Sequence, residues 1–259
     1  MEAVRIILKI FMWVFIIEFG SNIVMQSISY LFYSKAKKMT DNNCVPEHIQ
    51  ISDNLSGYGT NLDADSDRII LYFGGSNYIA YNSAGCFGKK FDIPFISADY
   101  YGSQGSHGRM NLKSLQKTAV DLYDWAENRY AGRKITVMGH SYGAGIAAYL
   151  ASERECDNLV MLAAYRDLAD LYNKIIPIFW GPAKAFITNN INAADYAKNI
   201  LCPTFIIGSL ADRTLSARLQ YKVRNSFQKS EVKIFDDVKH QSYLDSKRVI
   251  EYIIKTAIK

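Results

Sequence analysis

The sequence predicts an α/β domain in which a mostly parallel central sheet carries helices on both faces. Three observations lead to this prediction. Short apolar runs typical of buried strands alternate with amphipathic stretches typical of helices. Polar residues follow several predicted strands directly, at the sheet edge where parallel sheets place their ligand sites. The third observation is a Gly-x-Ser-x-Gly sequence, residues 139–143, between a predicted strand and a predicted helix.

Length and composition indicate one sizeable folded domain. The chain has 259 residues, of which 49% are hydrophobic and 21% charged, and this composition excludes a disordered chain. The net charge of +5 comes from scattered basic residues, so nucleic-acid binding is not indicated. The four cysteines form no CxxC pair, and no His/Cys cluster has zinc spacing. We therefore predict neither a metal nor another cofactor.

Residues 1–33 predict a hydrophobic N-terminal helix. Residues 10–33 contain a single formal charge, Glu18, and as a helix they would extend about 36 Å against a bilayer core of about 30 Å. Basic residues flank this segment on both sides. We expect a membrane-associated protein with a single N-terminal span, and the sequence leaves the side of the membrane undecided.

A polar stripe on this helix leaves alternatives to a membrane span open. Glu18, Asn22, Gln26 and Ser29 fall on one helical face. The stripe would face a partner helix, pack on the catalytic domain or lie in the membrane interface. A cleaved signal peptide and a soluble amphipathic helix are the alternatives to an anchor. We expect a chain that starts near Asn42 to be soluble and active.

Residues 34–47 are predicted to be a linker, and residues 48–259 to form the catalytic domain. Strands are predicted over 48–52, 55–62, 68–73, 91–97, 135–138, 159–163, 204–207 and 232–235. Helices are predicted over 78–90, 110–130, 144–151, 214–228 and 242–259. Residues 165–199 are too many for an ordinary connection and too apolar for a solvated loop, so they predict a small cap over the strand ends.

Ser141 is the candidate nucleophile. A strand, a tight turn and a helix are the context in which a strained serine projects above a sheet, and the small residues around it let backbones approach closely. A serine hydroxyl needs a base to take its proton, and the base needs an orienting acid. His240 follows the last predicted strand and is the candidate base, whereas His140 is read as structural. Asp212 is the candidate acid.

Two competitors for the acid, Asp167 and Asp170, follow the sixth predicted strand. The tetrahedral intermediate also needs backbone N–H donors for its oxyanion. We expect one from Tyr142 and another from Gly75 or Ser76, in the loop after the strand over 68–73.

Several segments together resemble serine hydrolases of the α/β-hydrolase fold, and most closely their single-span, membrane-anchored branch related to serine aminopeptidases and acyl-protein thioesterases. The resemblance covers about residues 48–258 and is carried by residues 71–77, 99–108, 139–143, 202–212 and 238–240. It implies that Ser141 is the nucleophile, Asp212 the acid and His240 the base. Gly74, where a histidine is common, and Tyr101, where an arginine is frequent, depart from the family pattern and bear on substrate preference.

The expected reaction is hydrolysis of a small-molecule acyl ester or thioester, lipid-like in character, through an acyl-serine intermediate. The apolar cap and the hydrophobic N-terminus favour an acyl substrate. An aminopeptidase-like or other amide hydrolase is the alternative within the class, and a non-catalytic binding protein with the same fold is the alternative outside it.

Overall fold

Eight strands form one sheet that organises the chain. The computed structural model describes residues 2–34 and 45–259, so most of the predicted linker, 35–44, lies outside the described residues. The strand order is β1-β2-β4-β3-β5-β6-β7-β8. Strand β2 runs antiparallel to both β1 and β4, and the other neighbouring pairs are parallel. The strands are β1 (Glu47–Ser52), β2 (Leu55–Thr60), β3 (Arg68–Phe73), β4 (Phe95–Ala98), β5 (Lys134–His140), β6 (Asn158–Leu162), β7 (Thr204–Ser209) and β8 (Ser230–Phe235).

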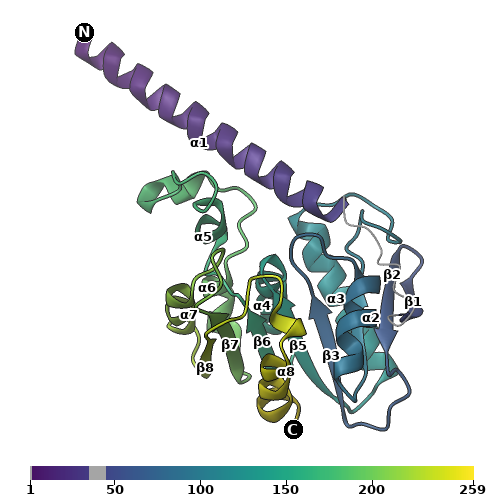
Figure 1. The fold of residues 1–259 in the computed structure, drawn as a ribbon. Helices are drawn as coiled ribbons and strands as arrows, with labels where there is room; N and C mark the ends of the chain where they lie inside the picture. Colours follow the sequence, from purple (N-terminus) through teal and green to yellow (C-terminus); the bar gives the residue numbers. More distant parts are fainter. Residues whose placement is uncertain (1, 35–44) are drawn as a thin grey trace.

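Helices cover both faces of this sheet. Helices α2 and α8 lie on one face, and α3 and α4 lie on the other (Figure 1). The helices are α1 (Glu2–Ser34), α2 (Ala80–Phe87), α3 (Leu112–Arg129), α4 (Tyr142–Glu153), α5 (Leu168–Tyr172), α6 (Ala193–Tyr196), α7 (Ala217–Arg224) and α8 (Lys247–Ile253). The predicted architecture, a mostly parallel central sheet with helices on both faces, is confirmed.

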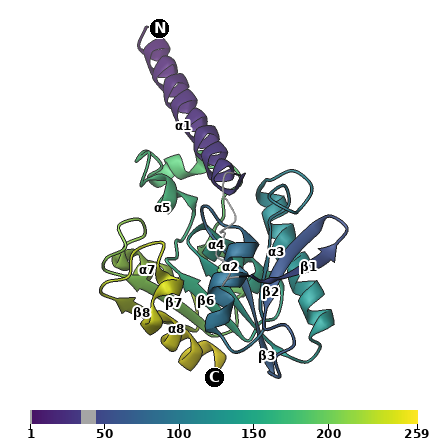
Figure 2. The ribbon, with the colours of Figure 1, turned by 45° about the vertical axis from the view of Figure 1, so that its right-hand side comes forward.

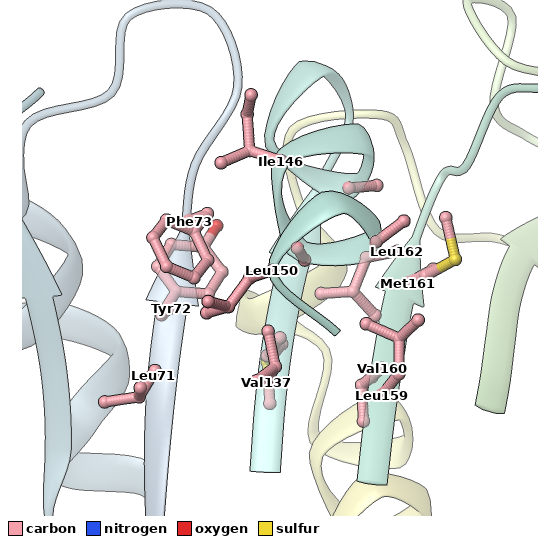
Figure 3. Close-up of a cluster of buried hydrophobic side chains, with 14 of the residues drawn as sticks. Leu71, Tyr72, Phe73, Val137, Ile146, Leu150, Leu159, Val160, Met161 and Leu162 are labelled. Atoms are coloured by element: carbon pink, nitrogen blue, oxygen red, sulfur yellow. The ribbon is translucent and has the colours of Figure 1, made fainter. Parts of the chain in front are cut away.

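The central strands are apolar because both of their faces are covered. Side chains of β3, β5 and β6 meet those of α4 in one buried cluster (Figure 3). Ile146 and Leu150 of α4 have no exposed surface and lie over this part of the sheet. The packing fixes α4 against the strand that precedes it, and so it fixes the turn between them.

Several predicted elements differ from the observed ones at their ends, among them β4, α7 and the C-terminal helix. Strand β4 begins at Phe95, four residues later than predicted, because a 3₁₀ turn over Gly88–Lys90 and then Pro94 precede it. Helix α7 begins at Ala217 rather than at Thr214. The predicted C-terminal helix divides into a 3₁₀ turn over Tyr243–Asp245, α8 and a π-helical turn over Ile254–Ile258.

The predicted cap region, 165–199, contains α5, a 3₁₀ helix over Gly181–Phe186 and α6. Helix α1 crosses over this region and then projects away from the rest of the molecule, as both ribbon views show (Figures 1 and 2). Its second half packs on the domain, where Met25 and Tyr33 are buried. Its first half, by contrast, exposes apolar side chains.

The expected membrane span is not supported. Among residues 2–34 and 45–259, no helix combines the length and the apolar character that crossing a membrane requires. Polar residues interrupt the apolar sequence of α1, and two of them bind the domain. Asn22 and Gln26 of the predicted polar stripe both donate hydrogen bonds to Thr188 of the cap region. The stripe therefore packs on the domain, which was one of the three alternatives that the sequence left open.

Candidate active site

Ser141 occupies the sharp turn between β5 and α4. Its backbone has φ 54° and ψ −123°, a conformation that costs a non-glycine residue about 1–3 kcal/mol and persists only where packing enforces it. Two glycines allow that packing. A Cβ atom on Gly139 would lie 2.3 Å from the carbonyl oxygen of Gly143, and one on Gly143 would lie 2.2 Å from that of Phe73. The sequence therefore folds into this turn because both positions lack a side chain.

The turn brings Ser141 to His240 and Asp212, which come from different strand ends. His240 follows β8, and its Nε2 lies 2.9 Å from the Oγ of Ser141. Its Nδ1 lies 2.9 Å from the Oδ2 of Asp212, which follows β7. Because a carboxylate only accepts hydrogen bonds, Nδ1 carries the proton and Nε2 is left to accept the hydroxyl proton of Ser141. This is the geometry of a nucleophile, a base and an orienting acid.

The carboxylate of Asp212 is fully buried and fully hydrogen-bonded. Its Oδ1 accepts the backbone N–H groups of Thr214 and Leu215 at 2.8 and 2.9 Å. Its Oδ2 also accepts the hydroxyl of Tyr243 at 3.0 Å. Burial alone raises the pKa of Asp212, but the bonds from His240 and the two amides more than offset it and hold the pKa below its usual value. The two amide bonds also explain why α7 begins only after Leu215.

His140 lies beneath the base and holds its backbone. The ring is buried, and its Nε2 donates a hydrogen bond of 2.7 Å to the carbonyl oxygen of His240. Burial, and to a smaller extent the neighbouring ring of His240, lowers the pKa of His140 to about 4. His140 is therefore neutral at pH 7 and serves as a fixed donor.

The competing acids lie in other ion pairs. The carboxylate of Asp170 accepts hydrogen bonds from the Nε and Nη2 of Arg166, at 2.9 and 2.6 Å. Asp167 accepts one from the Nζ of Lys184 at 2.6 Å. The structure thus brings Asp212, rather than either of these residues, to His240.

The predicted oxyanion donors surround the same serine. Gly75 touches it so closely that a Cβ atom there would lie 2.8 Å from the Cβ of Ser141 and 3.3 Å from its Oγ. Tyr142 is the first residue of α4, where backbone N–H groups have no partner within the helix. Ser76 follows Gly75 and lines the space in front of the base. Gly75 and Tyr142 thus both lie beside Ser141.

Two cavities lie beside His240 and the residue after it. The larger, of about 320 Å³, is lined by His240, Tyr142 and Ser76 together with residues of α1 and of the cap region. The smaller, of about 200 Å³, lies along the loop after β3 and reaches His140 and Tyr243. Ser76, Asn77 and Gln241 line both cavities. Across the part of the chain that the structure describes, no cluster of three or more His, Cys, Asp or Glu side chains could hold a metal ion.

Sequence reasoning missed two contributions to this site. The sequence predicts Tyr243 only as part of the last helix, although Tyr243 stands three residues after His240 and binds Asp212. It predicts Met25 as part of a membrane segment, yet Met25 lines the larger cavity. The signal that could have indicated the second contribution was the polar stripe, because a stripe on an apolar helix requires a polar partner.

Known proteins share this fold. The family model described as alpha/beta hydrolase fold matches residues 73–181, less than half of the chain. The esterase Pf2001 of Pyrococcus furiosus superposes with a TM-score of 0.61 at 19% identity, over 86% of this chain and 97% of that one. Est1E of Butyrivibrio proteoclasticus, solved with ferulic acid bound, gives a TM-score of 0.63 at 15% identity, over 82% of this chain and 100% of that one. These likenesses show the α/β-hydrolase fold.

Two curated relatives are similar in sequence over part of their length. The alignment with the lysophosphatidylserine lipase ABHD12 of Danio rerio is 145 residues long at 24% identity, and it covers 49% of this chain and 38% of the relative. The alignment with the protein of the same name from Xenopus tropicalis is 146 residues long at 25% identity, and it covers 50% of this chain and 38% of the relative. The match therefore spans well under half of each relative.

The low pKa of His140 predicts a specific acid sensitivity. Below about pH 6.5 the unfolded chain binds a proton at this residue, whereas the folded chain does not until about pH 4. The folded state therefore loses stability as the pH falls through this window, by about 3 kcal/mol from this group. Urea unfolding of the wild type and of His140→Gln, which keeps a donor without titrating, should show a shallower fall for the variant. Parallel curves for the two proteins between pH 6.5 and 4 would refute the assignment.

Proposed function

We propose that this chain, which has the α/β-hydrolase fold, is a serine hydrolase that cleaves an ester or thioester of a lipid-like acyl compound. The observation that carries the proposal is the continuous hydrogen-bonded path from the Oγ of Ser141 through His240 to Asp212. It lies at a strained turn that only tight packing maintains. A structural role explains neither the strain nor a buried carboxylate aimed at a histidine that faces a serine.

The proposed reaction begins with a proton transfer. The Nε2 of His240 takes the hydroxyl proton of Ser141 as Oγ attacks the ester carbonyl carbon, and Asp212 stabilises the imidazolium that forms. The carbonyl oxygen becomes an oxyanion that the N–H of Tyr142 and that of Gly75 or Ser76 stabilise, each such donor contributing about 2.7–4 kcal/mol. The tetrahedral intermediate collapses to acyl-Ser141, and His240 gives its proton to the departing alcohol or thiol.

The second half of the reaction regenerates the enzyme. His240 takes a proton from water, whose oxygen attacks the acyl carbon of acyl-Ser141. The carboxylic acid leaves as His240 returns the proton to Oγ. The net change is the addition of one water molecule across the ester bond, so the reaction requires no cofactor.

The cavities support an acyl or lipid-like substrate. Met25, Ile28, Leu171 and Ile175 give the larger cavity an apolar wall, which suits a hydrocarbon chain more than a peptide. The names of the two curated relatives, both lysophosphatidylserine lipases, favour a lipid ester as well.

A serine-directed fluorophosphonate probe tests the proposed nucleophile. The wild type should become labelled, and Ser141→Ala should not, with hydrolysis of a p-nitrophenyl ester reduced at least about 10³-fold. Ser152→Ala is the matched control and should label fully, because Ser152 lies in α4, the helix that follows Ser141, and its hydroxyl donates to the carbonyl oxygen of Tyr149. A folded wild type that neither labels nor hydrolyses esters would contradict the proposal and favour a binding protein. Faster cleavage of a matched anilide than of the ester would favour an amide hydrolase.

We further propose that the first half of α1 contacts a lipid surface. Every residue from Ile10 to Ile17 is exposed, and Phe11 is 69% exposed. Apolar side chains thus surround the helix on all sides, whereas a protein partner on one side would leave the others in water. A lipid surface takes up such side chains where the helix enters its interface, and the basic residues Arg5 and Lys9 suit an anionic headgroup layer.

Flotation with vesicles tests this contact, because aggregated protein sinks in the same gradient. The wild type should float with vesicles that contain anionic phospholipid, and the double variant Leu8→Glu, Phe11→Glu should lose most of that binding. Leu210→Glu changes an equally exposed leucine far from α1 in the sequence, and it should float like the wild type. The idea fails if the double variant floats as well as the wild type does.

A further inference from the structure

The larger cavity beside His240 has walls from three parts of the chain. The strand-end loops contribute Ser76 and His240, and the cap region contributes Leu171, Tyr172 and Ile175. The third wall comes from α1, through Met25, Ile28, Ser29 and Tyr33. A helix that served only to attach the domain to a surface would have no reason to line the space in front of the proposed base.

Polar contacts hold this part of α1 on the cap region. The Nδ2 of Asn22 donates to the Oγ1 of Thr188 at 2.9 Å, and the Nε2 of Gln26 donates to the carbonyl oxygen of Thr188. Asn189 in turn donates to the Oε1 of Gln26 at 3.4 Å. These bonds fix the rotation of the helix about its axis, because residues 22 and 26 lie one turn apart on the same face. With that face fixed, Met25 packs against the domain and is only 2% exposed.

The end of α1 lies against the proposed nucleophile's neighbour. Tyr33 is buried, and its ring packs edge to face on Tyr142 and Tyr100, with centroids 6.0 and 5.2 Å apart. Tyr142 directly follows Ser141 and is a proposed oxyanion donor. The helix thus contacts the domain at two points, through Gln26 on Thr188 and through Tyr33 on Tyr142. Ile28 lies between Gln26 and Tyr33 in the sequence and lines the cavity.

We propose that the second half of α1 is the wall of the substrate pocket that receives the apolar chain of the ester, and that Met25 and Ile28 set the length of chain accepted. The inference rests on the proposed ester hydrolysis and names the residues that select the substrate. A chain in this cavity is removed from water between α1 and the cap region, and each buried CH₂ favours binding by about 0.8 kcal/mol. A side chain that fills the cavity cancels that gain for long chains and affects short chains less.

This wall changes the expectation for a shortened protein. The sequence alone suggested that a chain starting near Asn42 keeps its activity. Such a chain lacks Met25, Ile28 and Tyr33 and leaves the cavity open on one side. It should therefore lose the preference for long-chain esters.

Two series of esters measure the effect on the full-length protein. In one, the acyl chain lengthens from acetyl to dodecanoyl on p-nitrophenol; in the other, the alcohol lengthens on a constant acetyl group. Ile28→Trp should lower kcat/KM for the longest esters of one series at least about tenfold, equivalent to two buried CH₂ groups. The acetyl ester of p-nitrophenol reaches less of this wall, so its kcat/KM should fall less than that of the longest esters. The series that responds shows whether the acyl or the alcohol chain occupies the cavity.

Ile23→Trp is the matched control. Ile23 is on the same helix but 51% exposed, and the same substitution there should leave both series unchanged. Met25→Ala makes the opposite change, because it enlarges the cavity and should move the preferred chain to greater length. This second variant also keeps the test decisive if Ile28→Trp folds poorly, as judged by circular dichroism.

The outcomes separate this inference from the proposed function. If the wild type hydrolyses esters and labels at Ser141, but Met25→Ala and a folded Ile28→Trp keep the wild-type length profile in both series, α1 does not select the chain. If the wild type neither hydrolyses esters nor labels, the proposed function itself fails. A shifted profile in Ile23→Trp would also overturn the inference, because the effect would then not depend on the cavity wall.

Discussion

The candidate site depends on the close approach of backbones around Ser141. Strand β5 must turn into α4 within one residue, and this forces Ser141 to a positive φ of 54°. Gly139 and Gly143 permit the approach of helix to strand, and Gly75 permits that of the loop after β3. A side chain at any of these positions would meet backbone or Ser141 itself. The buried cluster between α4 and the sheet supplies the packing that maintains this strained turn.

Several contacts also hold the proposed base, His240, in position. Asp212 orients the ring of His240 through Nδ1, while His140 binds the backbone carbonyl oxygen of the same residue. Asp212 is itself fixed by two amides and by the hydroxyl of Tyr243. A buried carboxylate with this many donors stays ionised, which is the state that stabilises a developing imidazolium. Removing a single donor should therefore perturb the site less than removing the packing that sets its geometry.

The sequence predicts the sheet well because buried parallel strands are continuous apolar runs, and those over 68–73 and 159–163 match β3 and β6 closely. It also indicates which residues follow strands, and this predicts that Ser141, Asp212 and His240 lie at the same edge of the sheet. The choice between Asp212 and Asp167 or Asp170 needed three dimensions, because it depends on which carboxylate meets His240 and which meets a cation. The place of α1 was not predictable either, since hydrophobicity alone does not distinguish a helix covered by lipid from one that lines a cavity. Its polar stripe was the only local sign of a protein partner.

In the proposed reaction, the acyl group of the substrate becomes covalently attached to Ser141. Acid-quenching the enzyme during turnover of p-nitrophenyl decanoate, followed by mass spectrometry of the intact protein and its peptides, measures this attachment. We expect a mass increase equal to the acyl group, located on the peptide that contains Ser141 and absent from Ser141→Ala. Steady hydrolysis that requires Ser141 but leaves the quenched protein unmodified, or an acyl group on another residue, would contradict it.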